Sequence, residues 1–600
     1  MKQPKIFIVE LIIALYLLMH LSTALMLPSQ GQARKFQETD YSSSVLFSRE
    51  NKLSMSSETG ENPAPQRLTK KQFLALQNGS DVRGVSVAHE RPVTLSPHEA
   101  VALGRGFARW LSLQKLRHWQ DKDPDPPKKP EDHLRVSVGM DPRITSESIS
   151  EALCQGLMAE GAEVKHFGLA STPAMFKSCI TPGFDFDAGI MVTASHLPFD
   201  RNGMKMFTKE GGMNKSTLKE VMDIAAEVYE LQHDEILYST LKPGKMDFLD
   251  EYKKQLVLKI RKDLDLPGDE YLQPLKGFKI LVNAGNGAGG FFIDILEELG
   301  ADTEGSLNLD PDGMFPNHVP NPEDKEAMDN TIHAVKEHQA DLGIVFDTDV
   351  DRCGVVDASG LVINRNRLIA LLSRIVLRDY PGSTIVTDSV TSNGLKTFIE
   401  SLGGKHLRYM KGYKNVIDKS IELNNEGIHS DMAIETSGHC AFKENNFLDD
   451  GAYLVVKVII EMAKLQKDGK KLTYLFEDLQ EPAESHEFRF VVAPDYEERT
   501  TEITAEFAEN LEKICIKLKE WEPEKMNYEG FRVSVDEGDG RFGWVMVRQS
   551  LHEPKVICNM ESETRGGLKK IGDILLSEFL NEMSEKLDFT CLTDHCIAEE

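Results

Sequence analysis

The sequence has few cysteines, and none of them is spaced for zinc binding or for disulfide exchange. There are 8 cysteines in 600 residues, with no CxxC pair and no other metal-site spacing. Reduced thiols are typical of a compartment that is not secretory, so we expect the chain to reside in one. The cysteines stand at positions 154, 179, 353, 440, 515, 558, 591 and 596.

Positive charge is also scarce. Lysine and arginine number 69 against 96 aspartates and glutamates, which leaves a net charge of -27. This balance argues against a nucleic-acid partner, because phosphate contacts require a basic surface. An acidic protein that binds an anionic ligand must concentrate its positive charge at the ligand site. The residues that could do so are Arg83, Arg143, Lys205, Arg352, Lys411 and Arg548.

The amino terminus carries a hydrophobic run at residues 6–27 with two lysines in front of it. Such a run is typical of a signal sequence or a membrane anchor, although Glu10 and His20 disfavour an anchor. A serine-rich stretch then extends to about Arg67, as in the remainder of a transit peptide. We predict removal after import into a plastid-like organelle such as a chloroplast. Cytoplasmic residence and membrane attachment are the alternatives, in that order.

Ser195 stands just past a short apolar run, AGIMV, in the segment DAGIMVTASHLPFDRNGMKMFT at 187–208. The apolar run predicts a buried strand, and the polar turn with Pro198 must leave the sheet. Because ligands collect at the carboxyl ends of strands in open α/β sheets, the hydroxyl of Ser195 is placed to react. The alternative is an ordinary turn or helix-capping serine. The neighbouring motifs favour a serine that carries a phosphoryl group.

Three aspartates, Asp347, Asp349 and Asp351, alternate directly after the apolar run LGIVF. Carboxylates at this density repel one another unless a cation joins them, and oxygen-only ligands suit a hard ion such as Mg²⁺. A calcium-binding EF-hand loop is excluded, because its sixth residue would be Arg352 and its twelfth Ala358. A solvated acidic turn is the alternative. The adjacent arginine disfavours it, since a guanidinium there is placed to hold phosphate.

Three further segments carry weaker signals. In AIETSGHCAFKENNFLDDG (433–451) the residues Glu435, Ser437 and His439 offer acceptors and donors to sugar hydroxyls. In WVMVRQSLHEP (544–554) a strand-like run ends at Arg548 and Ser550, two good phosphate donors. In VSVGMDPRITSES (136–148) another strand-like run leads into an arginine, a threonine and a serine. None of these three segments is specific by itself, but all five segments together, in this order, form a specific pattern.

In this order the motifs resemble those of the α-D-phosphohexomutase family, which includes phosphoglucomutase, phosphomannomutase and phosphoglucosamine mutase. TASHLP is similar to the family's TASHNP phosphoserine loop, DTDVDR to its metal loop and ETSGH to its sugar-reading loop. RQSLHEP stands where the family has the phosphate clamp RPSGTEP, and SDVRG resembles the segment that supplies an arginine, here Arg83. LVNAGNGAGG (281–290) and DPDGMFPNHVPNPE (310–323) are also similar to family segments. The likeness runs from about Ser80 to about Leu580.

The resemblance implies an α/β fold of four domains around a central cleft, three related α/β domains and a smaller, mobile α+β lid. Strand-like runs at the head of each proposed domain agree with this, and each of the first three leads into a helix-like segment. The length suggests three to five domains. We predict a targeting segment at 1–70, domains at 71–276, 277–380, 381–487 and 488–583, and a C-terminal tail at 584–600. The proline-rich stretch at 121–132 is predicted to be a surface insertion.

The resemblance also implies a mechanism. Ser195 rests as phosphoserine, donates its phosphoryl group to a hexose monophosphate and recovers a phosphate from the bisphosphate that forms. Mg²⁺ is held by the three aspartates with a phosphoserine oxygen as a further ligand, and most of the rate comes from positioning and electrostatics. The candidate proton acceptors are Lys205 and His439, with Arg83 nearby.

The family's substrate contacts map onto a second set of residues. Arg548 and Ser550 are expected to hold the non-reacting phosphate, and Glu435 and Ser437 to read the sugar hydroxyls. The full predicted substrate-binding set is Glu435, Ser437, Arg548, Ser550, Lys411, Arg143 and Arg352. We expect glucose first and mannose second as the sugar, glucose 1,6-bisphosphate as activator, a monomer or weak dimer, and no membrane attachment after processing.

The chain departs from the family pattern at several positions. Leu197 replaces an asparagine after Ser-His, and Leu551 and His552 replace the glycine and threonine of the phosphate clamp. Ile434 replaces a glycine before the sugar-loop glutamate, and Tyr413 stands where a histidine is common. None of these changes removes the nucleophile or a metal carboxylate. They leave open a relative that binds sugar phosphates with little or no turnover, and a phosphatase using the same metal loop is a poorer third reading.

Overall fold

The computed structural model describes residues 67–122, 133–231, 242–550 and 553–598, all within one compact unit, Pro65–Glu600. Most of the predicted targeting segment lies outside these residues, as do Leu551, His552 and nearly all of the proline-rich insertion. Within the described ranges, no helix is both long enough and apolar enough to cross a membrane.

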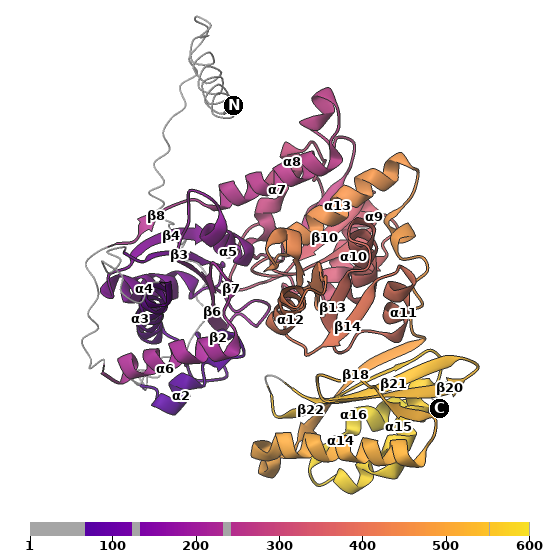
Figure 1. Cartoon of the computed structure of the whole chain (residues 1–600). Coiled ribbons are helices and arrows are strands. Elements are labelled where there is room, and N and C mark those ends of the chain that lie inside the picture. The colour runs from indigo at the N-terminus through magenta and orange to yellow at the C-terminus, as the bar shows by residue number, and fades with distance from the viewer. Residues whose placement is uncertain (1–66, 123–132, 232–241, 551–552, 599–600) are drawn as a thin grey trace, which may run out of the picture. The chain divides into compact units, whose positions relative to one another are not determined.

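The first part of the chain forms a mixed sheet with helices on both faces (Figure 1). Its elements are α2 (Lys70–Leu74), β1 (Gln77–Asn78), β2 (Asp81–Val85), α3 (Pro97–Lys122), β3 (Arg135–Met140), α4 (Ser146–Ala159), β4 (Glu163–Leu169), α5 (Thr172–Ile180), β5 (Ala188–Val192), β6 (Arg201–Thr208), β7 (Gly211–Gly212), α6 (Lys215–Leu231) and β8 (Gly244–Lys245). The helix that follows, α7 (Leu249–Leu264), packs mainly on α8 (Phe292–Glu298) and α13 (Gly451–Lys467) of the later parts. The strand order is β1-β2-β6-β5-β3-β4-β8, with β7 paired to β6. Because both faces are covered, β5 is a continuous apolar run: Ile190 packs with α3, α4 and α6, whereas Met191 packs with α5.

The second part repeats this plan on a smaller scale. Its elements are β9 (Ile280–Asn283), α8 (Phe292–Glu298), α9 (Lys325–His338), β10 (Leu342–Phe346), β11 (Cys353–Asp357) and β12 (Val362–Ile363). The sheet order is β12-β11-β10-β9, with β9 and β10 parallel. Val345 packs with α9 on one face, and Ile344 packs with α8 on the other. The acidic segment follows β10, at the carboxyl edge of the sheet.

The third part is again a sheet between helices. Its elements are α10 (Arg365–Asp379), β13 (Thr384–Asp388), α11 (Asn393–Ser401), β14 (Lys405–Tyr409), α12 (Tyr413–Asn425), β15 (Met432–Ile434), β16 (Cys440–Phe442), β17 (Leu448–Asp449) and α13 (Gly451–Lys467). The order is β14-β13-β15-β16-β17, with the first three strands parallel. Parallel strands end at one edge, so Asp388, Lys411 and Glu435 all lie at or just beyond that edge.

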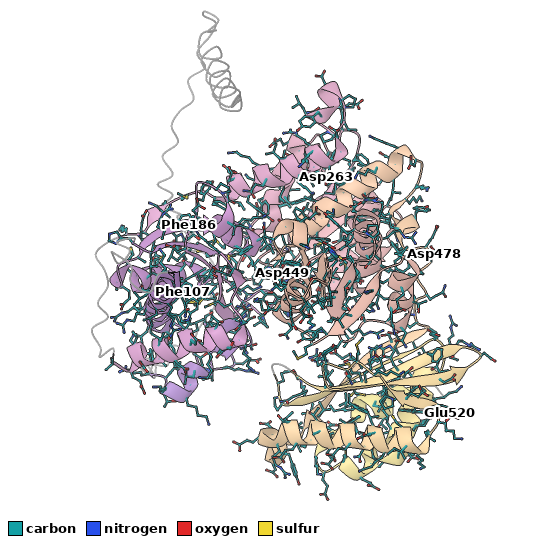
Figure 2. All side chains as sticks on the ribbon, viewed as in Figure 1. Phe107, Phe186, Asp263, Asp449, Asp478 and Glu520 are labelled. Atoms are coloured by element: carbon teal, nitrogen blue, oxygen red, sulfur yellow. The ribbon has the colours of Figure 1, made fainter. Side chains whose placement is uncertain are left out.

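The fourth part is an antiparallel sheet with helices packed against it. Its elements are β18 (Glu484–Val492), α14 (Thr500–Lys517), β19 (Trp521–Pro523), β20 (Phe531–Gly538), β21 (Arg541–Gln549), β22 (Lys555–Ser562), α15 (Gly567–Glu578), β23 (Leu587–Asp588) and α16 (Thr590–Ala598). The strand order is β19-β20-β21-β22-β18-β23. Figure 2 shows the side chains of all four parts, with Phe107 buried within the first and Glu520 exposed on the fourth. The predicted fold class, three related α/β domains followed by an α+β domain, is confirmed.

Arg532 of β20 ties the fourth part to the third. Its Nη1 donates to the carbonyl of Ser389 at 2.9 Å, and its Nε donates to Glu524 at 2.8 Å. The guanidinium lies 3.6 Å from the centre of the Trp544 ring, a cation–π contact. Arg408 of the third part pairs with the same glutamate at 3.3 Å. The two parts therefore meet through buried, mutually bonded charges.

Three predicted boundaries differ from the observed elements. The boundary at Tyr380 separates α10 from its partners, because α10 packs on α11 and β15 of the third sheet. The boundary at Glu487 falls inside β18, which begins at Glu484. The predicted tail at 584–600 contains β23, paired to β18, and α16, which buries Leu592 in the fourth core. Helix packing places α10 with the third sheet and α16 in the fourth core. Strand pairing places Glu487 and β23 in the fourth sheet, and neither kind of contact is visible in a local sequence pattern.

Candidate active site

Ser195 follows β5 in a segment that we call the serine loop, residues 193–198. Its backbone has φ of 50°, in the left-handed region that non-glycine residues seldom adopt. The Ser195 N–H donates to Thr193 Oγ1 at 2.9 Å, a local bond that stabilises this turn. The hydroxyl donates to Asp347 at 3.1 Å and accepts from Arg352 Nη2 at 3.1 Å. The serine loop thus meets the acidic segment of the second sheet through its reactive atom.

The acidic loop, residues 347–352, buries three carboxylates together. Asp347, Asp349 and Asp351 are each 0% exposed, and one oxygen of each lies within 4.8 Å of the others. The Oδ1 atoms of Asp349 and Asp351 have no hydrogen-bond partner among the described residues. Burial raises the pKa of Asp347 well above its usual value, and Asp351 adds to the rise. Because buried carboxylate oxygens without a hydrogen bond are costly, this oxygen-only cluster fits a hard divalent cation.

Two cations offset the charge of the acidic loop. Arg352 bonds Asp347 through Nε at 3.0 Å, and Lys205 of β6 pairs with Asp349 at 3.3 Å and with Asp351. Burial opposes the charge on Lys205, but the two aspartates outweigh it and raise the lysine pKa well above its usual value. Lys205 is therefore protonated and ion-paired with the acidic loop.

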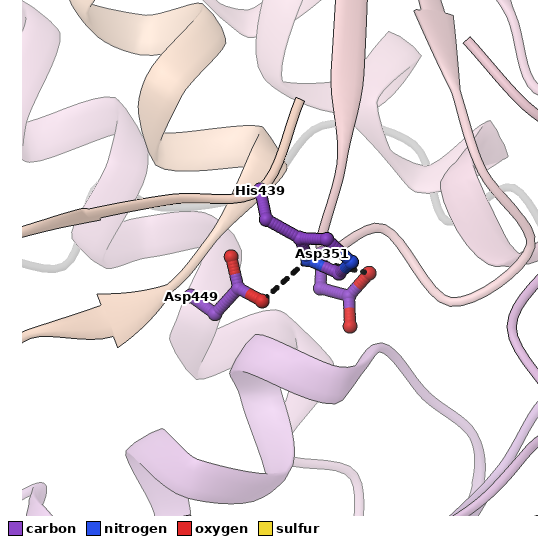
Figure 3. A group of neighbouring side chains, drawn as sticks. All are labelled: Asp351, His439 and Asp449. Carbon is purple, nitrogen blue, oxygen red and sulfur yellow. Dashed lines mark hydrogen bonds and ion pairs between the residues drawn. The ribbon is translucent and has the colours of Figure 1, made fainter. Parts of the chain in front are cut away.

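His439 and Asp449 form a closely bonded pair beside the acidic loop (Figure 3). His439 Nδ1 lies 2.5 Å from Asp449 Oδ2 and 3.7 Å from Asp351 Oδ1. Burial opposes the charge on His439, but Asp449 and then Asp351 outweigh it and raise the histidine pKa to about 9. An aspartate on Nδ1 orients the ring and leaves Nε2 for other contacts. Asp449 was not among the predicted site residues, although the DD pair in the quoted segment marked it as a polar strand end.

Backbone contacts hold the glutamate loop, residues 435–439, against the acidic loop. Arg352 and His439 form an antiparallel bridge, and the N–H of Gly451 donates to the carbonyl of Val350 at 3.1 Å. A Cβ on Gly451 would lie 2.7 Å from the backbone carbon of Arg352, and one on Gly438 would lie 2.7 Å from the carbonyl oxygen of Cys353. Only glycine permits these approaches.

Glu435 and Ser437 present polar atoms from the same loop. Glu435 is 3% exposed and accepts a bond from the Gly412 N–H at 2.6 Å. Burial raises the pKa of Glu435 to about 7, and the nearby Asp388 adds to the rise. The buried Oγ of Ser437 has no partner within the described part of the chain. Lys411, next to Gly412, donates its own N–H to Glu529 of the fourth part at 2.8 Å.

Arg83 links the serine loop to Asp81. Its Nη1 donates to the Thr193 carbonyl at 2.8 Å, and its Nη2 pairs with Asp81 at 2.8 Å. The other oxygen of Asp81 accepts a bond from the hydroxyl of Tyr413 at 2.9 Å. The predicted catalytic residues Ser195, Lys205, His439 and Arg83 are therefore linked through a few shared contacts, and their catalytic roles stay predictions.

Arg143 is placed differently from the prediction. Its Nε pairs with Asp141 at 3.1 Å, and its Nη atoms donate to four carbonyl oxygens. Those carbonyls belong to Ser195, Leu197, Pro198 and Arg201. All five N–H groups of the guanidinium are used, so no donor remains for a substrate. The geometry assigns Arg143 to the serine loop instead.

Arg548 and Ser550 are not brought to Ser195 by any described bond. Arg548 Nη2 donates to Glu487 at 3.2 Å, and its buried Nε has no partner among the described residues. The Ser550 N–H donates to the carbonyl of Lys555 at 3.0 Å. Both residues lie at the carboxyl end of β21 or just after it, as predicted, and their substrate role stays a prediction.

Three protein-family comparisons match consecutive stretches of the chain. The phosphoglucomutase/phosphomannomutase alpha/beta/alpha domain I matches residues 75–232, domain II matches 260–360 and domain III matches 364–482. These three matches follow the three mixed sheets in order.

Whole relatives are similar over most of the chain. The phosphomannomutase/phosphoglucomutase of Pseudomonas putida is 30% identical over 451 residues, 74% of this chain and 87% of the relative. The phosphoglucomutase/phosphomannomutase of Thermococcus kodakarensis is 30% identical over 455 residues, 74% of this chain and 90% of the relative.

Solved structures share the fold. A phosphoglucomutase/phosphomannomutase family protein from Burkholderia thailandensis aligns with a TM-score of 0.65 at 24% identity, covering 86% of this chain and 97% of that one. The open form of parafusin, a phosphoglucomutase from Paramecium, aligns with a TM-score of 0.59 at 17% identity, covering 84% and 92%.

Proposed function

Because the chain belongs to the phosphoglucomutase/phosphomannomutase family, we propose that it is a mutase that interconverts hexose 1-phosphate and hexose 6-phosphate. The observation that carries the proposal is the contact of Ser195 Oγ with both Asp347 and Arg352, at 3.1 Å each. A hydroxyl so placed has a candidate metal ligand on one side and a guanidinium on the other. This combination favours phosphoryl transfer, because the group in transit carries dispersed negative charge.

The phosphoryl group is proposed to reside on Ser195 between turnovers. It passes to the free hydroxyl of a hexose monophosphate and forms a hexose bisphosphate. The bisphosphate turns around in the site and returns its other phosphate to Ser195, which regenerates the phosphoserine. Glucose 1,6-bisphosphate is accordingly the expected activator, because it can phosphorylate an empty serine.

Asp347, Asp349 and Asp351 are the residues that would hold Mg²⁺. The ion would supply electrostatic stabilisation of the transferring phosphoryl group. Arg352 already donates to the serine oxygen and is placed to contact a phosphate there. Its planar fork suits an oxyanion.

His439 and Lys205 are the candidates for proton transfer at the sugar hydroxyl. Asp449 orients His439, and His439 lies within one loop of Glu435 and Ser437. Lys205 is held by two carboxylates, so it acts as a cation until those contacts change. Because Asp449 and Asp351 outweigh the effect of burial and raise the pKa of His439 to about 9, this histidine is protonated near neutral pH. We therefore favour His439 as the group that donates a proton to the sugar oxygen when the phosphoryl group leaves it, and Lys205 for charge compensation.

Glu435 and Ser437 are proposed to read the sugar hydroxyls. A buried carboxylate and a hydroxyl that has no partner among the described residues reject analogues that lack hydroxyls, because their own hydrogen bonds would then be lost. Arg548, Ser550 and Lys411 are proposed to bind the distal phosphate. We expect glucose first and mannose second, a monomer or weak dimer, and residence in a plastid-like organelle after loss of the amino-terminal segment, with the cytoplasm as the alternative.

The test is peptide mapping of the purified protein with and without glucose 1,6-bisphosphate, followed by turnover of glucose 1-phosphate and mannose 1-phosphate in Mg²⁺. Phosphate on Ser195, with turnover that Ser195→Ala loses, supports the mutase. Ser148→Ala, at an exposed serine of α4, is the matched control and should keep both properties. An unphosphorylated serine and no turnover would favour the relative that only binds sugar phosphate.

A further inference from the structure

Tyr413 joins the third part of the chain to the first at the site. It begins α12 directly after Gly412, whose φ of 119° is accessible mainly to glycine. Its hydroxyl donates to Asp81 Oδ1 at 2.9 Å and accepts from Ser80 Oγ at 3.3 Å. These partners lie more than 330 positions earlier in the chain. The hydroxyl is therefore anchored to the segment that supplies Arg83.

The ring of Tyr413 contacts both candidate proton-transfer residues. The ammonium of Lys205 lies 5.2 Å from the ring centre, within the range of a cation–π contact. The imidazole of His439 stacks on it with centres 5.2 Å apart and planes inclined by 26°. A single rigid side chain thus contacts both residues and fixes their spacing.

A series of bonds runs from Tyr413 to the serine loop. Asp81 takes the tyrosine hydroxyl on one oxygen and Arg83 on the other. Arg83 then donates to the carbonyl of Thr193 at 2.8 Å, and Thr193 Oγ1 accepts the N–H of Ser195 at 2.9 Å. Each of these bonds involves a charged group or the loop backbone. Loss of the tyrosine hydroxyl frees one oxygen of Asp81, while Arg83 keeps its bonds to the other oxygen and to Thr193.

We propose that Tyr413 is a positioning residue that holds the first and third parts together while the bisphosphate intermediate turns around, and so keeps that intermediate bound. The inference rests on the proposed mutase activity. A bisphosphate that reorients within the site must give up some contacts before it makes new ones. During that interval, the contacts that join the surrounding parts limit the escape of the bisphosphate. Tyr413 makes such contacts, because its hydroxyl bonds Asp81 of the first part and its ring contacts Lys205 and His439.

The decisive measurement is the fraction of bisphosphate released to solvent per turnover, followed with isotope-labelled glucose 1-phosphate on phosphorylated enzyme. Tyr413→Phe keeps the ring and removes one hydrogen bond to a carboxylate, so we expect the released fraction to rise about tenfold. The variant should lose phosphoserine during turnover and require added glucose 1,6-bisphosphate. Its rate of phosphorylation by that bisphosphate should change little.

Tyr413→Leu removes the ring contacts as well and is expected to lower kcat further at a similar KM. Tyr229→Phe is the matched control, because Tyr229 also donates to a carboxylate, Glu99 at 2.7 Å, within the first part alone. It should lower stability without raising bisphosphate release.

If wild type turns over hexose phosphate and Tyr413→Phe releases the same fraction of bisphosphate as wild type, the inference is overturned. The proposed mutase activity is then unaffected. Equal increases in Tyr413→Phe and Tyr229→Phe would also overturn it, since loss of stability would then explain both. A wild-type protein without phosphoserine or turnover would remove the proposed function and the intermediate together.

Discussion

Arg143 donates a hydrogen bond to the carbonyl oxygen of Ser195, and the two residues together set the shape of the serine loop. A serine with φ of 50° is under backbone strain, of order 1–3 kcal/mol for such a conformation. The strain persists because four carbonyls around the turn converge on one guanidinium, itself paired with Asp141 at 3.1 Å. The reactive hydroxyl owes its direction to a residue that does not touch it.

Arg143→Lys is therefore expected to slow phosphorylation of Ser195 by glucose 1,6-bisphosphate about a hundredfold, since a misplacement of one ångström can cost that much. Lysine keeps the charge but has no planar fork to serve four carbonyls. Arg135→Lys is the control, because Arg135 bonds a carbonyl of the same domain, that of Phe184, away from the loop. Equal phosphorylation rates for Arg143→Lys and wild type would contradict this role.

Removal of one carboxylate from the acidic loop should abolish stabilisation by Mg²⁺. When the Mg²⁺ concentration is about 100 times the dissociation constant, binding raises the free energy of unfolding of wild type by about 2.7 kcal/mol. The increase for Asp349→Asn should be far smaller. Thermal unfolding with Mg²⁺ and with a chelator measures this without reference to activity. Asp302→Asn, at an exposed aspartate in the second part, should respond as wild type does. A Tm that is insensitive to Mg²⁺ in wild type would argue against the metal site.

Glu435→Gln should change how stability depends on pH. Burial and then Asp388 raise the pKa of Glu435 from 4.5 to about 7, so the folded state holds this proton more tightly than the unfolded chain. Its stabilising contribution is present below pH 4.5 and is lost as the pH rises through 7. Between pH 4.5 and pH 7, the free energy of unfolding of wild type should therefore fall by up to about 3 kcal/mol relative to that of the variant.

Urea unfolding at pH 5 and pH 8 measures the effect of Glu435→Gln. The free energy of unfolding of the variant, relative to that of wild type, should be higher at pH 8 than at pH 5. The variant should also lose mutase activity. Glu426→Gln, at an exposed glutamate after α12, is the control. Parallel stability curves for Glu435→Gln and wild type would show that burial does not perturb this carboxyl.

Gly451→Ala should push the start of α13 away from the acidic loop. The added Cβ would lie 2.7 Å from the backbone carbon of Arg352, so the backbone there must shift, and we expect the Arg352–His439 bridge to open. We expect kcat to fall about a hundredfold as His439 moves away from the acidic loop. Gly212→Ala is the control, since its Cβ would meet Phe207 at an ordinary 3.5 Å. Unchanged kcat in Gly451→Ala would show that this close approach is dispensable.

Much of the site was predictable because its residues lie in short segments just after strands. Ser195 follows β5, Asp347 follows β10 and Glu435 follows β15, and an apolar run followed by polar residues marks each position in the sequence. The structure brings these residues together as expected, and their chemical roles stay predictions. Arg143 was misassigned because an arginine after a strand has the same sequence pattern whether it contacts a ligand or loop carbonyls.

The sequence alone determined where the serine and acidic loops lie, because an apolar run followed by polar residues is a property of neighbouring positions, and its family resemblance implied the order of the four domains. Only the tertiary structure decided that α10 belongs to the third sheet, that Asp449 orients His439 and that Tyr413 bonds Asp81. These contacts join residues that are distant in sequence or that pack on a face no local pattern specifies. Their energies depend on burial and on which partners the folded chain places within hydrogen-bonding distance.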